Sequence, residues 1–501
     1  MKKSILTGLL GILCVNVMAQ NDIDAIRYTN KKFGSTAKSM SIAGATGALG
    51  ADISSASINP ASMAQYRKGE FSFSVGFVNS KNTSTFMGNS LSDNAFKMNV
   101  PNLGLVFANK TLSKKGEKGW KNSTIAFNMA RVADFNRVIN FEGFNTETSL
   151  MDYFAERANG FSKDQIRATD DEFDNGFNSK TTMAWEGYLF NETGSRKYAA
   201  NTNPLLRNMS QKGIIQQSGG MNEYNFSVAG NYSDLLYIGA TLNYTSVKFK
   251  ETKSHSETDF SSSTDSFGID NFTFSDQLKT TGGGFSGRLG MVMRVNDYVR
   301  VGASLQTPMI LKLADNYSFD LVSTINTGSS FNFESKSGNY DYTLLTPARY
   351  TVSATGIFGK RGFLSADVEA VDYSAMRLRS SSGISNTAME VANDDIRRKY
   401  TSTYNIRIGG ELVSENFRFR GGYASYGSPL KDNSGGNLRS EYITGGIGIR
   451  EEDWALDFAL VHTLGNDIYQ PYVLNDKSKT QAYSDNKFTS NTVVITLSTK
   501  F

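Results

Sequence analysis

The stretch Phe71-Ser72-Phe73-Ser74-Val75-Gly76-Phe77 carries a large apolar residue at every odd position and a small or polar residue at most even ones. Residues 454–460, Trp-Ala-Leu-Asp-Phe-Ala-Leu, repeat the pattern with the large apolar residues at the even positions. Successive side chains of a strand point to opposite faces. Alternation with period two therefore indicates strands with one apolar and one polar face.

This alternation continues along the chain after about residue 68. Runs of this kind lie near residues 69–79, 102–110, 121–132, 222–232, 235–250, 283–294, 298–323, 346–358, 363–373, 400–413, 416–426, 439–450, 454–464 and 489–501. Their number, fourteen, is even. In a closed antiparallel sheet, an even number of strands places both chain ends at the same rim.

The connections between these runs differ in length in a regular way. Tight turns are expected at 231–234, 296–297, 359–362, 414–416 and 451–453, with an intermediate case at 111–120. Long polar loops are expected at 80–101, 133–221, 251–282, 324–345, 374–399, 427–438 and 465–488. Short turns at one rim and long loops at the other are typical of outer-membrane barrels. We predict an all-β fold, a fourteen-stranded antiparallel transmembrane β-barrel over 69–501 whose largest extracellular loop is about 133–221. A secreted sandwich or solenoid is the alternative.

The composition excludes several classes of protein. The chain has 501 residues, with 52 Lys plus Arg against 48 Asp plus Glu, and a formal charge of +4. That charge is too small for a dedicated nucleic-acid binder. No stretch after residue 20 approaches the ~18 apolar residues of a membrane-spanning helix. A membrane protein built of strands is not excluded, because half of each strand is polar.

The first residues have the features of a secretory signal peptide. Lys2 and Lys3 precede an apolar stretch over 5–17, and Ala19 offers a small residue before a cleavage site. Leu13 stands before Cys14 where a lipoprotein signal has a small residue, so lipidation is not favoured. Residues 1–19 are therefore expected to direct export to the cell outer membrane. The mature chain would then contain no cysteine.

Residues 20–68 do not follow the strand pattern. Residues 41–64 are mostly small and weakly charged, and such a segment cannot build a core of its own. Asn59 and Pro60 suit the N-cap and first position of a helix. We predict a hatch, or plug, that fills the lumen. A flexible linker is the alternative.

The alternation also assigns side chains to the two faces of the wall. Outward positions are Phe71, Phe73, Leu236, Ile238, Leu242, Val301, Val352, Phe417, Phe419, Ile447, Leu456 and Phe458. Inward charged positions are Arg288, Arg294, Asp367, Glu369, Arg407, Glu411, Arg418, Arg420, Arg450 and Asp457. In a water-filled pore such charges set ion preference. In a plugged barrel they pair with one another or with the hatch. They can also form a solvated lining without a role in transport.

Several short segments resemble the FadL-type transporters of long-chain fatty acids and hydrocarbons, the FadL/TodX group. The segment Gly34-Ser35-Thr36-Ala37-Lys38-Ser39-Met40 with Gly44, 47–49, Asp52 and Asn59-Pro60-Ala61 is similar to that family's hatch. Weaker matches lie at 301–308, 346–350, 364–369 and 372–374. The terminal Phe501 resembles the aromatic C-terminus that the barrel-insertion machinery recognises.

This resemblance implies a function and a set of partners. A hatch with gating residues Gly34, Gly44, Gly47, Asn59, Pro60 and Ala61 would block a monomeric barrel in outer-membrane lipid. A hydrophobic small-molecule ligand would enter from outside and leave sideways through the wall. The resemblance implies no nucleic acid and no cofactor, and it names no ligand-contacting residue.

Other functions are weighed on few residues. The two histidines are His255, in an expected polar loop, and His462, near the outer end of a strand. No Gly-x-Ser-x-Gly elbow occurs, so an enzyme is not expected, and no metal site is expected either. Haem uptake is one alternative, and a structural or adhesive barrel that acts through its long loops is another. Two sets of loop residues are also noted: the acidic cluster at 170–174, expected to be solvated, and candidate mouth aromatics Phe144, Tyr153, Phe154, Phe161, Phe173, Phe177, Trp185, Tyr188 and Phe190.

Overall fold

The computed structural model describes residues 22–110, 118–167, 179–202, 208–259, 268–381, 387–431, 436–476 and 478–501. The expected signal peptide, the acidic cluster at 170–174, Phe173 and Phe177 lie outside these residues. No helix in the described part is both long enough and apolar enough to cross a membrane.

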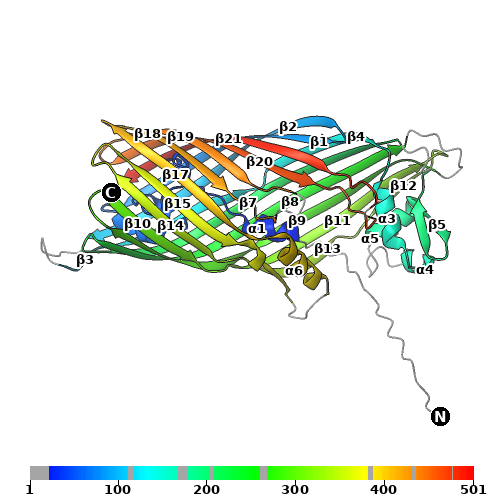
Figure 1. Cartoon of the computed structure of the whole chain (residues 1–501), viewed down its shortest axis with the longest axis horizontal. Coiled ribbons are helices and arrows are strands. Elements are labelled where there is room, and N and C mark those ends of the chain that lie inside the picture. Colours follow the sequence, from blue (N-terminus) through cyan, green and yellow to red (C-terminus); the bar gives the residue numbers. More distant parts are fainter. Residues whose placement is uncertain are drawn as a thin grey trace, which may run out of the picture.

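The strands form one closed antiparallel barrel (Figure 1). Four strands of the barrel are each divided into two labelled elements: β3 with β4, β10 with β11, β13 with β14, and β15 with β16. Counted in this way the barrel has fourteen strands, and the prediction is confirmed. In order the strands are β1 (Glu70–Phe86), β2 (Asn89–Lys110), β3 (Trp120–Asp134) with β4 (Arg137–Asn145), β7 (Met209–Tyr232), β8 (Leu236–Asp259), β9 (Ile269–Arg294), β10 (Val299–Gln306) with β11 (Ile310–Ile325), β13 (Gly338–Leu345) with β14 (Arg349–Ile357), β15 (Gly362–Asp372) with β16 (Arg377–Ser380), β17 (Ser402–Ser414), β18 (Phe417–Tyr426), β19 (Ser440–Arg450), β20 (Trp454–Tyr469) and β21 (Ser484–Lys500). β1 pairs with β21 and closes the cylinder.

The wall has the two faces that the alternation predicts. Ten of the twelve expected outward residues are exposed, and the other two, Leu236 and Leu456, are half-buried. The inward positions Arg288, Asp367, Arg407, Arg420 and Asp457 are almost completely buried. An exposed apolar belt around a polar interior is the arrangement of a membrane barrel.

Several strands continue well beyond the predicted runs. The interval 80–101 is not a loop: β1 and β2 continue through it and meet at Met87 and Gly88. Both residues have positive φ, 47° and 82°, as a two-residue hairpin turn requires. The predicted loop 133–221 is likewise shortened to 146–208 by β4 and β7. His255 lies in β8 rather than in a loop. These predictions were wrong because the outer strand ends carry polar and apolar side chains on the same face, as in β1, where Ser80, Asn82, Ser84 and Phe86 all point inward, which obscures the alternation.

Residues 22–66 lie in the barrel interior and are largely buried. They contain α1 (Asp22–Thr29), α2 (Ala37–Ser41), η1 (Ile53–Ser57) and η2 (Pro60–Gln65). Side chains of Thr36, Asp52 and Asn59 cap α2, η1 and η2 by accepting a backbone N–H. We call residues 22–66 the interior segment.

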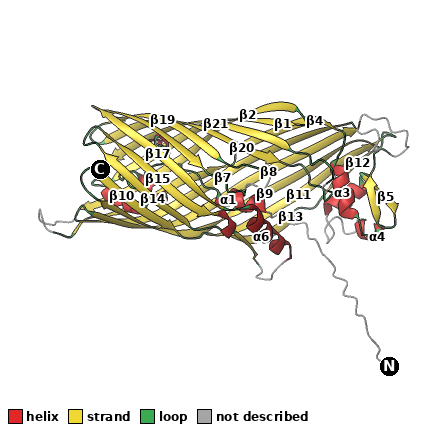
Figure 2. Ribbon diagram, in the orientation of Figure 1, coloured by secondary structure: helices red, strands yellow, loops and turns green. Residues whose placement is uncertain are grey.

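A small lobe covers the rim with the long connections (Figure 2). It contains α3 (Leu150–Ala158), α4 (Lys163–Ile166), α5 (Ser179–Glu186), and the hairpin of β5 (Phe190–Gly194) and β6 (Lys197–Ala200). Its buried side chains form one apolar cluster with the barrel residues Phe272, Phe274 and Leu321. We call this lobe the outer cap. A short strand, β12 (Ser330–Glu334), pairs antiparallel with the outer end of β11.

One further helix, α6 (Thr387–Lys399), lies on the side of the barrel (Figure 1). It follows η3 (Tyr373–Ala375) and β16 and precedes β17. Met389, Ala392 and Ile396 of α6 are buried in a cluster that includes residues of α1 and β16. The helix thus forms part of the wall where, in the described part, β16 has only β13 as a ladder partner.

Candidate functional site

Asn59 fixes the interior segment to the barrel wall. Its side-chain Nδ2 donates to Gly47 O at 2.7 Å and to Met291 O of β9 at 3.1 Å, and its Oδ1 accepts from Ala61 N. A Cβ on Gly290 of β9 would lie 1.9 Å from Asn59 Oδ1. A Cβ on Gly239 of β8 would lie 2.5 Å from the carbonyl carbon of Pro60. Glycine on the wall therefore lets the Asn59-Pro60-Ala61 turn lie directly against the strands.

The three predicted hatch glycines also occupy close contacts. A Cβ on Gly34 would lie 2.2 Å from Arg131 O of β3, and one on Gly47 would lie 2.0 Å from Ser353 Oγ of β14. Gly44 has φ +74°, and a Cβ there would lie 2.6 Å from Phe33 Cβ. These positions admit only glycine without rearrangement.

The predicted lumen charges form separate ion pairs. Arg420 bridges Glu411 and Asp457 at 2.7 and 2.6 Å, and Arg407 lies 3.7 Å from Asp367. Arg418 stands apart: it is half-exposed, and its guanidinium donates to the carbonyls of Glu415 and Phe417.

The interior segment takes part in several of these contacts. Asp367 accepts from Gly47 N, and Arg288 donates to Ala56 O at 2.9 Å. Arg349 pairs with Glu369 at 2.9 Å and donates to Thr29 O. These charges are neutralised by partners within the protein, so they are not available to select ions that pass through the lumen.

Sequence reasoning missed two partners in this network. Lys31 of the interior segment pairs with the buried Glu223 of β7 at 2.6 Å, and Glu223 also lies 3.7 Å from Arg288. Arg349 falls within the weak family match at 346–350 and is not among the predicted inward charges. The alternation in β7 would place Glu223 on the inward face, so its burial could have been predicted. Its partner could not, because Lys31 reaches it only through the path of the interior segment.

The wall is interrupted between the second and third strands. The ladder between β2 and β3 ends at the pair Asn102–Ala130. Among the described residues no ladder joins residues 89–101 to β3 or β4. Side chains bridge the two edges instead, as Asn99 Nδ2 donates to Asp134 Oδ2 at 3.3 Å. We call this interruption the wall break.

Local irregularities in three neighbouring strands produce the wall break. Pro101 of β2 has no N–H for a ladder. The register of β1 against β2 shifts between Ser74 and Gly76, and that of β3 against β7 shifts between Arg131 and Ala133. Such bulges bend strands away from their neighbours.

The interior segment passes directly behind the wall break. Lys32 N donates to Val132 O of β3 at 2.9 Å, and Phe33 N donates to the hydroxyl of Tyr426 at 3.1 Å. A cavity of about 260 Å³ lies there between the segment and the wall. Its apolar lining includes Phe33, Met40, Val78, Pro101, Val132, Ala133, Tyr442, Val461 and Phe488.

Lys32 is the interior segment's cation at this cavity. It is half-buried, and its Nζ lies 4.6 Å from the centre of the Tyr426 ring. Burial lowers its pKa to about 7, and the nearby guanidinium of Arg349 adds to this lowering. No salt bridge joins Lys32 to another described residue. The cavity can therefore hold an apolar molecule with or without an anionic group.

A second cavity, of about 290 Å³, lies beneath the outer cap. Its lining includes Phe141, Phe154, Phe274, Tyr469, Tyr472, Lys180, Lys253, His255 and Asp276. Of the predicted mouth aromatics, Phe154 lines it, Phe190 is buried in the core of the cap, and Phe144 is exposed. Tyr153 also lines it, whereas Phe161 and Trp185 pack around the core of the cap and Tyr188 is exposed.

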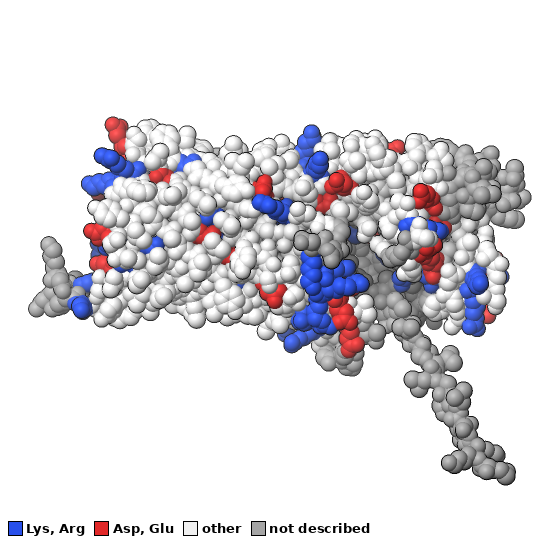
Figure 3. All heavy atoms as spheres, in the orientation of Figure 1, with Lys and Arg blue, Asp and Glu red and all other residues white. Residues whose placement is uncertain are grey.

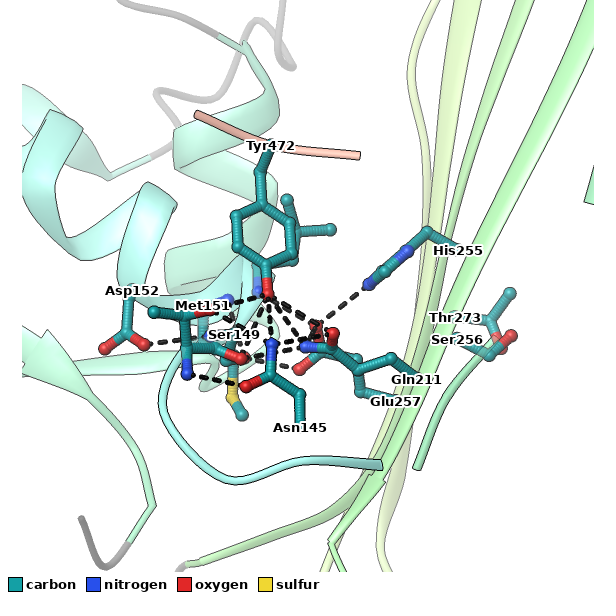
Figure 4. A network of polar contacts seen from close by, with 12 residues as sticks. Asn145, Ser149, Met151, Asp152, Gln211, His255, Ser256, Glu257, Thr273 and Tyr472 are labelled. Carbon is teal, nitrogen blue, oxygen red and sulfur yellow. Dashed lines mark hydrogen bonds and ion pairs between the residues drawn. The ribbon is translucent and has the colours of Figure 1, made fainter. Parts of the chain in front are cut away.

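A buried polar network holds the cap to the barrel (Figure 4). The carboxylate of Glu257 on β8 accepts from Ser149 Oγ, Leu150 N at 2.9 Å and Gln211 Nε2 at 2.9 Å. His255 Nε2 also lies 2.9 Å from Glu257. This nitrogen is therefore engaged within the protein, which gives no support to a haem ligand at His255. His462 contacts Asn491.

Comparison with known proteins identifies the fold. No family model matches the sequence, and no curated protein matches it. Among solved structures, the toluene transporter TodX of Pseudomonas putida is 12% identical, with a TM-score of 0.50 over 94% of this chain and 99% of that one. A Pseudomonas aeruginosa FadL homologue is also 12% identical, with a TM-score of 0.50 over 93% and 98%. The resemblance to the FadL/TodX group is thus confirmed at the level of the fold: this chain has the barrel of those transporters.

Proposed function

We propose that this protein is an outer-membrane transporter for hydrophobic small molecules, such as long-chain fatty acids or aromatic hydrocarbons, and not an enzyme. The wall break carries the proposal. A barrel that merely anchors loops has no need of an interrupted ladder with an apolar cavity behind it. Burial of a methylene group contributes about 0.8 kcal/mol, so such a cavity attracts apolar solutes that an open water-filled pore would not hold.

The proposed path uses both cavities in turn. A ligand enters beneath the outer cap among Phe141, Phe154 and Tyr472. The interior segment acts as the hatch and separates this chamber from the periplasmic rim. Movement of residues 32–34 away from β3 opens the cavity at the wall break, and the ligand leaves sideways between Asn99 and Asp134. The exposed Phe96 and Met98 of β2 offer an apolar surface beside that exit.

The test closes the wall break reversibly. Asn99→Cys and Asp134→Cys are combined in the mature chain, which is expected to lack other cysteines, and linked by a short thiol-specific cross-linker that reduction removes. Saturable uptake of a fluorescent fatty acid and of toluene is measured in proteoliposomes. We expect the link to suppress uptake and reduction to restore it.

The control link lies where the ladder is intact. Leu105 and Phe127 are directly opposite on β2 and β3, so Leu105→Cys with Phe127→Cys can be linked without changing the wall break. This link is expected to leave uptake unchanged. Uptake that continues through the Asn99–Asp134 link refutes the lateral route. Absence of saturable uptake of both solutes in the unmodified protein refutes the transport function.

A further inference from the structure

An aromatic belt marks the level at which the wall leaves the apolar region on the loop side. Tyr244, Phe285 and Ile310 are exposed and lie at one level of β8, β9 and β11. The ring centres of Tyr244 and Phe285 are 5.0 Å apart. Tyr350 and Tyr404 continue the belt across Ala370 of β15. Rings of this kind lie at the membrane interface.

Exposed lysines follow directly beyond this belt on the outward face. Lys312 is two residues beyond Ile310, and Lys248 is four beyond Tyr244. Lys250 and Lys279 are six residues beyond Tyr244 and Phe285. At about 3.3 Å per residue and with the usual strand tilt, these side chains start roughly 5 to 15 Å above the belt. Their flexible stems can reach back toward it.

Lys250 and Lys279 are placed in direct opposition. The register pairs them across β8 and β9, and both side chains are exposed. Like charges opposite each other destabilise a sheet. No salt bridge joins Lys248, Lys250, Lys279 or Lys312 to any other residue in the part of the chain that the structure describes. An anion shared between these lysines would remove the repulsion.

The basic surface continues sideways onto β16 and α6. Register places Lys312, Thr343 and Arg379 at one level, and Arg379 is exposed. Arg398 of α6 is 72% exposed. Figure 3 shows the blue side chains gathered at α6. The acidic residues on this surface are Asp341, which is exposed on β13, and Glu390, Asp394 and Asp395 of α6, of which Asp394 and Asp395 pair with Arg397 and Arg398.

We propose that this surface, the basic arc of Lys248, Lys250, Lys279, Lys312 and Arg379, binds the phosphate groups of anionic lipids in the outer leaflet. The inference rests on the proposed membrane position but not on transport. The basic arc lies just beyond the aromatic belt, at the level of the lipid phosphates. Each lysine near an anionic membrane surface contributes a separate attraction, so several of them act together.

The first experiment measures lipid binding directly. The full mature protein in neutral detergent is titrated with phosphatidylglycerol or phosphatidylcholine, and bound lipids are counted by native mass spectrometry. We expect preferential binding of phosphatidylglycerol, weakened about tenfold or more by Lys250→Gln with Lys279→Gln. Lys163→Gln with Lys197→Gln removes two exposed lysines from the outer cap and should leave binding unchanged. Equal binding of the two lipids, or equal binding by both double variants, overturns the proposal.

The second experiment uses the like-charge pair and distinguishes a lipid from free phosphate. In phosphatidylcholine vesicles, Lys279→Glu should raise the Tm, because the carboxylate introduced opposite Lys250 can pair with that lysine. Adding phosphatidylglycerol should raise the Tm of the wild type but not that of Lys279→Glu. Inorganic phosphate alone should have no such effect. An equal gain from inorganic phosphate shows an anion site without lipid specificity and overturns the proposal.

Transport is measured separately on the same samples. The Lys250→Gln and Lys279→Gln double variant in phosphatidylcholine vesicles should take up hydrophobic solutes like the wild type. Failure of the lipid experiments therefore leaves the transport function standing, and failure of transport leaves the lipid result standing.

Discussion

Glycine on the wall determines how closely the interior segment approaches the strands. Gly290 faces Asn59 so closely that a single methyl group would displace the turn at Asn59-Pro60-Ala61. The same strand offers Gly287, where a Cβ has no neighbour closer than 3.8 Å. An alanine at Gly290 would disturb the contact with Asn59, whereas an alanine at Gly287 would only replace a glycine in the same strand. Comparison of the two variants therefore isolates the effect of the contact.

We expect Gly290→Ala to loosen the interior segment at a cost of about 1–3 kcal/mol, the usual cost of overpacking. The measurement is hydrogen exchange of residues 53–65 in the detergent-purified protein. Gly287→Ala should leave exchange there unchanged. Equal exchange in the two variants would mean that the wall does not hold the turn.

Arg420 provides a second comparison within one strand. Arg420→Met leaves Glu411 and Asp457 without their shared cation, and loss of one partner from a buried pair costs about 3–5 kcal/mol. Arg418→Met removes a half-exposed cation that is bonded only to carbonyls and should cost less than about 1 kcal/mol. Urea unfolding measures both. A similar loss of stability in the two variants would contradict the assigned ion pairs.

The charge of Lys32 should make the binding of anionic ligands, but not of neutral ones, depend on pH. Its pKa is about 7, so the side chain is charged below that pH and neutral above it. Binding of a fatty acid should weaken as the pH rises from 6 to 8, about one unit to either side of this value. Binding of toluene should not change. Lys32→Met should remove the pH dependence, and a fatty-acid profile that persists in this variant would show that another group is responsible.

At the scale of residues, the sequence predicts faces better than partners. Alternation with period two assigned Arg288, Asp367 and Arg407 to the interior, where the structure places them. It could not pair Lys31 with Glu223, which lies 192 positions away. That contact depends on the path of the interior segment through the lumen, and no local pattern encodes this path.

At the scale of elements, strands could be predicted only where one face is apolar. The outer parts of β1 and β2 were missed, although Phe96 and Met98 retain period two there. The sequence does indicate where the ladder of β2 is interrupted, because Pro101 has no N–H to donate to a neighbouring strand. The sequence does not show that the interruption lies opposite residues 131–134. That position follows from the register of β3 against β2 and β7.

Glu257 is the centre of the buried polar network that helps to attach the outer cap to the barrel. Glu257→Ala leaves Ser149, Leu150 N, Gln211 and His255 without their shared partner, and each unmade buried hydrogen bond costs about 1–3 kcal/mol. We expect faster hydrogen exchange in α3 with the barrel unchanged. Glu142→Ala, which removes a half-exposed carboxylate of β4 that lies 3.8 Å from Lys212, is the matched control. Equal exchange in both variants would show that the apolar cluster alone holds the cap.

At the scale of the whole molecule, the barrel is longer than a bilayer requires. β7, β8 and β9 have 24, 24 and 26 residues, whereas about 9–11 span a membrane. The additional length carries the chamber beneath the cap away from the lipid. The fold could be predicted because the alternating runs are regular and even in number, whereas the additional length and the cap have no such pattern.

The junction of the two barrel ends has a consequence for biogenesis. Gly69 and Phe501 exchange backbone hydrogen bonds of 3.0 and 3.1 Å at the end of the ladder between β1 and β21, which closes the cylinder. The interior segment is synthesised before any strand. A segment that is in place before the ladder of β1 and β21 forms need not be threaded through a closed rim. The order of these two events, closure of the seam and entry of the segment, therefore decides whether the lumen is filled from the open sheet or through a rim.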